Sequence, residues 1–250
     1  MIQIKNLTKT FGKNLIWKDV SFDINDGETL AIIGKSGCGK SVLLKHLNAL
    51  LYPDSGDIII NGENIFDLTY TELRKLRQRF GILFQGAALF DSINTFENIA
   101  FPLRYFTNQT EEEIRENVEN ALEMVNLKGA GTRATSELSG GMRKRVGVAR
   151  AIILKPEYLL YDEPTSGLDP KTSEEINELI VYMADSLDIT SIVITHDMHS
   201  VLTIAEKVAF LDEQKLSWFG TVDEMQDSNC EALVDFITAS EYQIKSSKNN

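Results

Sequence analysis

Cysteine and long apolar runs are scarce in the 250-residue sequence. Its two cysteines, Cys38 and Cys230, lie far apart without the spacing of metal ligands, so a disulfide framework is excluded and a reducing cytosol is expected. No apolar run approaches the roughly 20 residues that a membrane-spanning helix needs. The first ten residues also lack the apolar core of a signal peptide. If the protein works at a membrane, we expect another chain to supply the spans.

Positive charge is also in short supply. The chain has 25 Lys and Arg against 37 Asp and Glu, a formal net charge of −12. Such a surface repels the phosphate backbone of nucleic acid and gives no broad attraction to anionic lipid, so no nucleic-acid partner is expected. With 43% hydrophobic and 25% charged residues, the composition is that of an ordinary globular protein.

The sequence pattern alternates short strands with helices. Residues 2–7 and 20–24 alternate apolar with polar side chains and predict half-buried strands, whereas the apolar run 30–34 predicts a strand covered on both faces. Residues 86–155 are mostly helical in pattern, and strand–helix alternation returns after them. This order predicts an α/β fold with a mostly parallel sheet, an N-terminal antiparallel β subdomain and an inserted helical subdomain. A polar tail, 246–250, is expected to fray.

A phosphate-binding motif, G-x-x-x-x-G-K-[ST], follows the buried strand and opens a helix. Its glycines let backbone N–H groups turn inward around phosphate oxygens, and the helix N-terminus adds partial positive charge. Lys40 is placed to bridge the β- and γ-phosphates, and the Ser41 hydroxyl to hold Mg²⁺. The residues expected to bind ATP here are Gly34, Lys35, Ser36, Gly37, Cys38, Gly39, Lys40, Ser41 and Val42.

Cys38 lies inside this loop, where a small residue that merely fits explains it better than a nucleophile or redox sensor does. The nearby helix N-terminus could lower the pKa of its thiol. In that case we expect alkylation of Cys38 to block nucleotide binding.

Two carboxylates follow a second apolar run. Residues 158–161 end in Asp162 and Glu163, which a strand would deliver to the carboxyl edge of the sheet, where α/β folds bind ligands. Asp162 is expected to hold Mg²⁺ through water, and Glu163 to polarise the water that attacks the γ-phosphorus. Alone, a strand ending in two solvated acids explains the pair equally well. The phosphate motif earlier in the chain favours the catalytic interpretation.

The stretch Leu138-Ser139-Gly140-Gly141 lies twenty-odd residues before this pair, and here the sequence resembles the ATP-binding subunit of ABC transporters over about 1–225. The resemblance implies a P-loop NTPase core of the RecA-like type. It implies that Ser139, Gly140 and Gly141 cover the γ-phosphate of ATP held by the opposite subunit of a homodimer. A hydroxyl and N–H groups at a helix start do form an anion site. Asp169, in the loop from 166, is implied to cross the dimer interface.

Three further residues match the family by position. Phe11 matches the aromatic that stacks on adenine, although a core aromatic remains an alternative. Gln85 matches the glutamine that senses Mg²⁺ and water, and His196 matches the histidine that contacts the γ-phosphate. His46 and His199 match nothing and are expected to be ordinary surface or helix residues.

One departure narrows the resemblance. The family has Gln after the two glycines, where this chain has Met142 followed by Arg-Lys-Arg. With the stretch 84–104, this version looks like the ATPases of Mla/MCE-type phospholipid transport systems, although Met142 is also explained as a tolerated substitution in another importer. The apolar residues of 86–105 then imply docking of an integral permease, or else they pack the helical insertion. A lipid-binding MCE-type partner is implied as well.

The resemblance thus implies an ATP-hydrolysing subunit of a lipid transporter, bound peripherally to the cytoplasmic face of the inner membrane, with ATP and Mg²⁺ as ligands. Residues 1–85 and 156–225 are expected to form the nucleotide-binding core, 86–155 the helical subdomain, and 226–250 a C-terminal extension. Import of a small solute and release of lipoprotein remain alternatives. A non-transport ABC protein of DNA repair or the ribosome is disfavoured by the single phosphate motif and the acidic charge.

Overall fold

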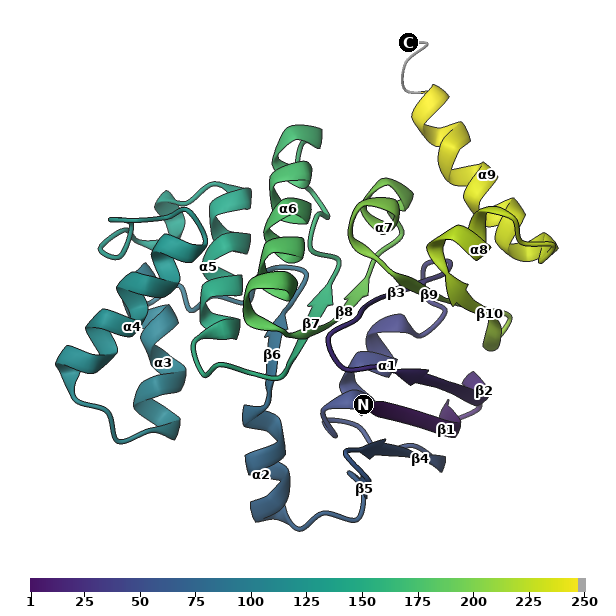
Figure 1. Ribbon diagram of the computed structural model, residues 1–250, viewed down its shortest axis with the longest axis horizontal. Coiled ribbons are helices and arrows are strands. Elements are labelled where there is room, and N and C mark those ends of the chain that lie inside the picture. The colour runs from purple at the N-terminus through teal and green to yellow at the C-terminus, as the bar shows by residue number, and fades with distance from the viewer. Residues whose placement is uncertain (247–250) are drawn as a thin grey trace. The chain divides into compact units, whose positions relative to one another are not determined.

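The computed structural model describes residues 1–246 and is drawn in Figure 1. The strands are β1 (Ile2–Phe11), β2 (Asn14–Ile24), β3 (Thr29–Ile33), β4 (Ser55–Ile60), β5 (Glu63–Asn64), β6 (Phe80–Leu83), β7 (Tyr158–Asp162), β8 (Thr190–Ile194), β9 (Lys207–Asp212) and β10 (Lys215–Thr221). The helices are α1 (Lys40–Leu47), α2 (Tyr70–Gln78), α3 (Thr95–Phe106), α4 (Glu111–Met124), a 3-10 turn (Thr135–Glu137), α5 (Gly140–Ile152), α6 (Pro170–Leu187), α7 (Met198–Ile204), α8 (Val222–Gln226) and α9 (Glu231–Ser246). Apart from Ser246, the tail expected to fray lies outside the described residues.

The chain forms two compact units. The first unit contains residues 1–74 together with the chain from 192 onward, and the second contains residues 75–191. The three-part division expected from the sequence stays a prediction.

An antiparallel sheet makes up one part of the first unit, with the strand order β2-β1-β4-β5. Its first two strands are longer than the sequence pattern predicts, because they pair with each other from Ile2 up to Phe11 opposite Asn14. Strands β4 and β5 form an antiparallel hairpin. Asn61 (φ 51°) and Gly62 (φ 88°) have the two positive φ angles of a type I′ turn, which suits the twist of paired strands.

The other sheet of the first unit presents the phosphate motif. Strand β3 runs parallel to β9, which pairs antiparallel with β10. All five residues of β3 are buried, as expected for a strand covered on both faces. Helices α7, α8 and α9 pack on this sheet through one apolar cluster of Ala31, Ile33, Met198, Val201, Val208, Phe210, Met225 and Leu233. The buried strand therefore ends at Ile33 and delivers loop 34–39 to the edge of the sheet.

The second unit combines parallel strands with a helical layer. Strands β6 and β7 pair in parallel, and helices α3, α4 and α5 pack on one another (Figure 1). Helix α5 lies very close to β6, since a Cβ added to Gly147 would come within 2.5 Å of Leu83 Cδ1 and one added to Gly81 within 2.4 Å of the Ala151 carbonyl oxygen. The mostly helical pattern predicted for 86–155 is confirmed, and so is the α/β class of the chain.

Two elements end before the apolar runs of sequence that contain them. Helix α1 stops at Leu47, because Ala49 takes a left-handed conformation (φ 52°) although the apolar pattern continues to 51. Strand β6 stops at Leu83, so Gln85 lies in the following loop and is exposed.

Candidate active site

The predicted phosphate loop is built where only glycine fits. A Cβ on Gly34 (φ 150°) would lie 2.3 Å from the Leu211 carbonyl oxygen, and one on Gly39 (φ 97°) would lie 2.4 Å from Ile16 Cγ2 and 2.5 Å from Trp17 Nε1. Residues with a side chain rarely adopt such φ angles, and the surrounding backbone and side chains leave no room for a Cβ atom. The two glycines therefore hold the loop tightly against its own unit.

Lysine charge is concentrated at this loop. Lys40 opens α1 and is buried, and its Nζ donates to the carbonyl oxygens of Gly34 (2.7 Å) and Lys35 (3.1 Å). Its ammonium group thus lies over the loop itself. Lys35 Nζ lies 3.6 Å from Asp212 Oδ1, and the half-buried Ser41 occupies the first turn of α1. This arrangement of cations, helix N-terminus and glycine backbone suits a polyphosphate.

Cys38 fits the expectation of a small residue that is not a nucleophile, but the lowered thiol pKa that the helix N-terminus could give is not found. Partial burial raises the pKa of its thiol above the ordinary value, and the charge of Lys40 only partly opposes this. The Lys40 charge and the backbone N–H groups at the start of α1 lower the pKa of the thiol, but the loss of hydration around it outweighs them. Cys38 is therefore a poor nucleophile in this loop.

The predicted catalytic pair lies at the end of β7. Asp162 is the last residue of the strand, and Glu163 follows it with a left-handed backbone (φ 50°); both are half-buried. A left-handed conformation costs a non-glycine residue roughly 1–2 kcal/mol, so the surroundings must hold it. The Glu163 carbonyl oxygen accepts from Lys144 Nζ at 2.9 Å and from the Ser166 N–H at 3.2 Å.

Lys144, from α5, joins the two predicted catalytic loops. Its buried Nζ donates to the carbonyl oxygens of both Gln85 and Glu163. Gln85 Nε2 in turn donates to Ser166 Oγ at 3.3 Å. Burial lowers the pKa of Lys144, against the opposing charges of Asp162 and Glu163. We name this arrangement of Gln85, Lys144, Glu163 and Ser166 the Lys144 junction.

Ser139, Gly140 and Gly141, which we call the signature residues, and the loop 166–169 belong to the same unit. Ser139 is exposed and caps α5, its Oγ accepting from the Met142 N–H at 3.2 Å. Asp169 caps α6 by accepting from the Thr172 N–H at 3.1 Å and from the Thr172 hydroxyl, and these bonds lower the pKa of Asp169. A Cβ on Gly141 would lie 2.4 Å from Thr172 Cγ2, so the starts of α5 and α6 are in close contact.

The predicted site residues divide between the two units. The first unit holds Phe11, the loop with Lys40, and His196; the second holds the Lys144 junction and the signature residues. Phe11 is 45% exposed, which excludes the core alternative, and Lys9 Nζ lies 5.3 Å from its ring centroid. His196 is also exposed, between β8 and α7.

His46 was expected to be an ordinary surface or helix residue, and it is a buried residue of α1. Its ring packs edge-on against Trp17, with ring centroids 5.1 Å apart, and Nδ1 contacts the Val42 carbonyl oxygen at 2.7 Å. Burial lowers the pKa of His46 below its usual value. His199 is exposed on α7, as expected.

An aromatic surface flanks Gln85 in the sequence. Phe84, Phe90, Phe101 and Tyr105 are all exposed, and the rings of Phe90 and Phe101 lie 5.1 Å apart. Phe84, Phe90 and Phe101 line a cavity of about 330 Å³ on the second unit, and Arg150 lies 6.0 Å from the Phe90 ring. An exposed apolar cluster of this kind is typical of a docking surface.

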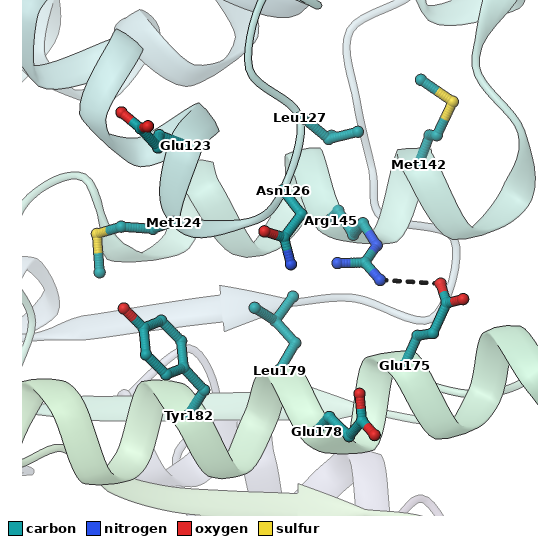
Figure 2. Close-up of a pocket in the computed structure, with 10 residues that line it drawn as sticks. All are labelled: Glu123, Met124, Asn126, Leu127, Met142, Arg145, Glu175, Glu178, Leu179 and Tyr182. Carbon is teal, nitrogen blue, oxygen red and sulfur yellow. Dashed lines mark hydrogen bonds and ion pairs between the residues drawn. The ribbon is translucent and has the colours of Figure 1, made fainter.

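Sequence reasoning missed the role of the basic run after Met142. Its members anchor backbone carbonyl groups at different places: Arg143 reaches Leu138, Lys144 reaches Gln85 and Glu163, and Arg145 reaches Val125. Figure 2 shows Arg145 on a cavity of about 810 Å³, where it pairs with Glu175 at 3.0 Å. One signal was available, since Lys144 lies three residues after Gly141 and four before Val148, on the buried face of the helix.

None of the helices in residues 1–246 is long and apolar enough to cross a membrane.

Comparisons with known proteins agree with the motif series. A family model described as ABC transporter matches residues 17–166. The chain is 42% identical over 236 residues to the probable ribonucleotide transport ATP-binding protein mkl of Mycobacterium leprae, covering 94% of this chain and 68%, about two thirds, of that protein. It is 40% identical to the intermembrane phospholipid transport system ATP-binding protein MlaF of Haemophilus influenzae, covering 95% of this chain and 90% of that protein.

A solved structure gives the same result for the fold. The ATP-binding cassette MJ0796, in a dimeric post-hydrolysis state bound to ADP and Pi, matches with a TM-score of 0.81 and 31% identity. The match covers 89% of this chain and 99% of that one.

Proposed function

The chain belongs to the ABC transporter family as an ATP-hydrolysing, ATP-binding subunit, and from this premise we propose that two copies clamp ATP between them to drive phospholipid movement through a separate permease. The observation that carries the proposal is the exposed Ser139 at the start of α5. Its Oγ accepts the cap bond, so its O–H can donate to a phosphoryl oxygen. A chain with both a phosphate loop and such an exposed anion site is suited to pairing head to tail.

The phosphate loop supplies the ATP site. Loop 34–39 and Lys40 surround the phosphates, Val42 continues the helix, and Phe11 offers an exposed ring for adenine. The Ser41 hydroxyl and the Asp162 carboxylate are hard oxygen donors of the kind that Mg²⁺ prefers. When bound, Mg²⁺ would neutralise charge on the β- and γ-phosphates.

The second unit supplies the groups for hydrolysis. Glu163 accepts a proton from the attacking water, and the exposed Gln85 side chain, which contacts Ser166, orients that water. His196 donates to the γ-phosphate. These assignments agree with the positions of the three side chains at loop edges rather than inside the core.

Dimerisation is the proposed switch. Ser139, Gly140 and Gly141 cover the γ-phosphate of the partner copy, and Asp169 lies at the interface between copies. Because the γ-phosphate contacts both copies, ATP has a much higher affinity for the closed pair, and hydrolysis releases it. A ligand with such a difference in affinity is what a conformational cycle requires.

Phospholipid is the proposed cargo. MlaF matches over nine-tenths of its own length, and Met142 is the feature of this chain that looks like that type of ATPase. The aromatic surface of 84–105 fits an apolar helix of an integral permease, which would hold the subunit at the cytoplasmic face of a membrane. An MCE-type lipid-binding protein completes the proposed complex. We propose three functional divisions of this chain: the nucleotide-binding core of 1–85 with 156–225, the helical subdomain 86–155 and the C-terminal extension 226–250.

Two experiments test these proposals separately. Glu163→Gln is expected to bind ATP, stop turnover and run as a dimer in gel filtration with ATP, whereas Glu163→Gln/Ser139→Glu is expected to stay monomeric. A Glu163→Gln protein that hydrolyses ATP at the normal rate removes Glu163 from its role.

The cargo is tested by affinity purification of the tagged chain in detergent, with mass spectrometry of proteins and lipids. We expect a permease and bound phospholipid. A soluble solute-binding protein in their place favours import of a small solute, and the ribonucleotide named for mkl would be the first solute to examine.

A further inference from the structure

Two basic side chains of helix α5 form hydrogen bonds with the backbones of two loops. Lys144 Nζ donates to the carbonyl oxygens of Gln85 and Glu163, and one turn and a half farther along, Arg150 donates to those of Ala87 (2.7 Å) and Ala88 (2.8 Å). Main-chain carbonyl groups, rather than carboxylates, are therefore the partners of both cations. Such bonds fix the path of a loop and leave its side chains available for chemistry.

The backbone is strained in both of the loops that accept these hydrogen bonds. Glu163 (φ 50°), Ala87 (φ 60°) and Ala88 (φ 46°) all adopt left-handed conformations without being glycine. Such conformations persist only where the surroundings over-determine them. Lys144 is 5% exposed, so removing its ammonium group would deprive two carbonyl oxygens of a buried charged donor, which is costly.

We propose that Lys144 is a positioning residue for ATP hydrolysis, which holds the Glu163 and Gln85 backbones so that their side chains meet the attacking water together. The proposal rests on the proposed roles of Glu163 and Gln85. The contacts of Lys144 Nζ are with the carbonyl oxygens of Gln85 and Glu163. Lys144 acts through a closed set of contacts, since Gln85 Nε2 reaches Ser166 Oγ and the Ser166 N–H reaches the Glu163 carbonyl oxygen.

The position of Lys144 also relates the junction to Ser139. Both belong to the start of α5, five residues apart, which is a rise of about 7.5 Å along a helix. A shift of α5 when Ser139 contacts a phosphoryl group would reach the two carbonyl bonds directly. The rate of hydrolysis would then depend on the position of the Lys144 side chain as well as on the Glu163 carboxylate.

The test compares two neighbouring basic residues of α5 in the full-length protein. Lys144→Met removes the junction bonds and keeps an unbranched apolar stem. Arg145→Met is the matched control, since Arg145 is the next basic residue of the same helix, is half-buried, and contacts Val125 and Glu175 instead. We expect kcat for ATP to fall about 10- to 100-fold in Lys144→Met, the loss of two charge-assisted hydrogen bonds, with KM changing less than about twofold. Arg145→Met should keep kcat, and Lys144→Arg should recover most of it.

A double variant shows whether Lys144 acts through Glu163. Lys144→Met added to Glu163→Gln should not slow the residual rate further, because both changes disable one unit. Additive losses, an unchanged kcat in Lys144→Met, or an equal loss in Arg145→Met would each overturn the proposal. If Lys144→Met fails to fold, Lys144→Gln replaces it, and a kcat no lower than that of Lys144→Arg would overturn the proposal. A Glu163→Gln protein with normal hydrolysis would instead refute the proposed function.

Discussion

Adding a single methyl group to the signature, Gly141→Ala, tests how closely α5 and α6 are packed. The new Cβ would lie 2.4 Å from Thr172 Cγ2, far inside contact distance, and Thr172 cannot turn away without breaking the bond from its hydroxyl to Asp169. Overpacking of this kind costs about 1–3 kcal/mol. Alanine in place of glycine within a helix returns about 1 kcal/mol. We therefore expect a net loss of up to about 2 kcal/mol in the free energy of unfolding.

Urea denaturation of four proteins measures this loss. Gly140→Ala is the control, because its Cβ would meet only the flexible end of Leu168 at 3.2 Å, and it should be nearly neutral. Thr172→Ser removes the obstructing methyl and keeps the hydroxyl, so Gly141→Ala/Thr172→Ser should recover most of the loss. A Gly141→Ala protein as stable as wild type, or a double variant as unstable as Gly141→Ala alone, would refute the packing argument.

Three further predictions follow from single residues. Lys40→Ala should weaken ATP binding about 10- to 100-fold in calorimetry through the lost charge-assisted bonds, and unchanged affinity would contradict the assigned phosphate loop. Cys38 should react with iodoacetamide more slowly at pH 7.5 than a free thiol, because burial raises its pKa, and a faster reaction would show that the Lys40 charge dominates. Burial lowers the pKa of His46 in the folded state, so the unfolded chain binds the His46 proton more tightly. The free energy of unfolding therefore falls as the pH drops below about 6.5, by at most about 1.4 kcal/mol per pH unit. His46→Gln should lose less stability between pH 7.5 and 5.5 in urea denaturation, and an identical loss would refute this cause.

The fold class was accessible from the sequence because local signals agree with one another. The all-apolar β3 leads into a glycine loop, and Asn61-Gly62 has the turn chemistry that its hairpin requires. Ser139 and Asp169 are residues that prefer helix starts, and both cap helices in the structure. Turns and helix caps depend on residues that are neighbours in the sequence, so a sequence pattern can predict them.

Other features depend on partners far along the chain and were not accessible. Lys144 belongs to the short basic run after Met142, and its carbonyl partners lie 59 and 19 residues away along the chain. The pKa of Cys38 and the burial of His46 likewise depend on what the fold packs around them. A one-dimensional pattern shows the helix N-terminus beside Cys38, and it does not show the desolvation that outweighs it.

A structure of the Glu163→Gln protein with Mg²⁺ and ATP would show directly whether two copies of this chain clamp the nucleotide. We predict a two-fold pair in which the Ser139 hydroxyl of one copy donates to the γ-phosphate held by Lys40 of the other. A nucleotide whose γ-phosphate contacts residues of one copy alone, with Ser139 exposed to solvent, would contradict the claim.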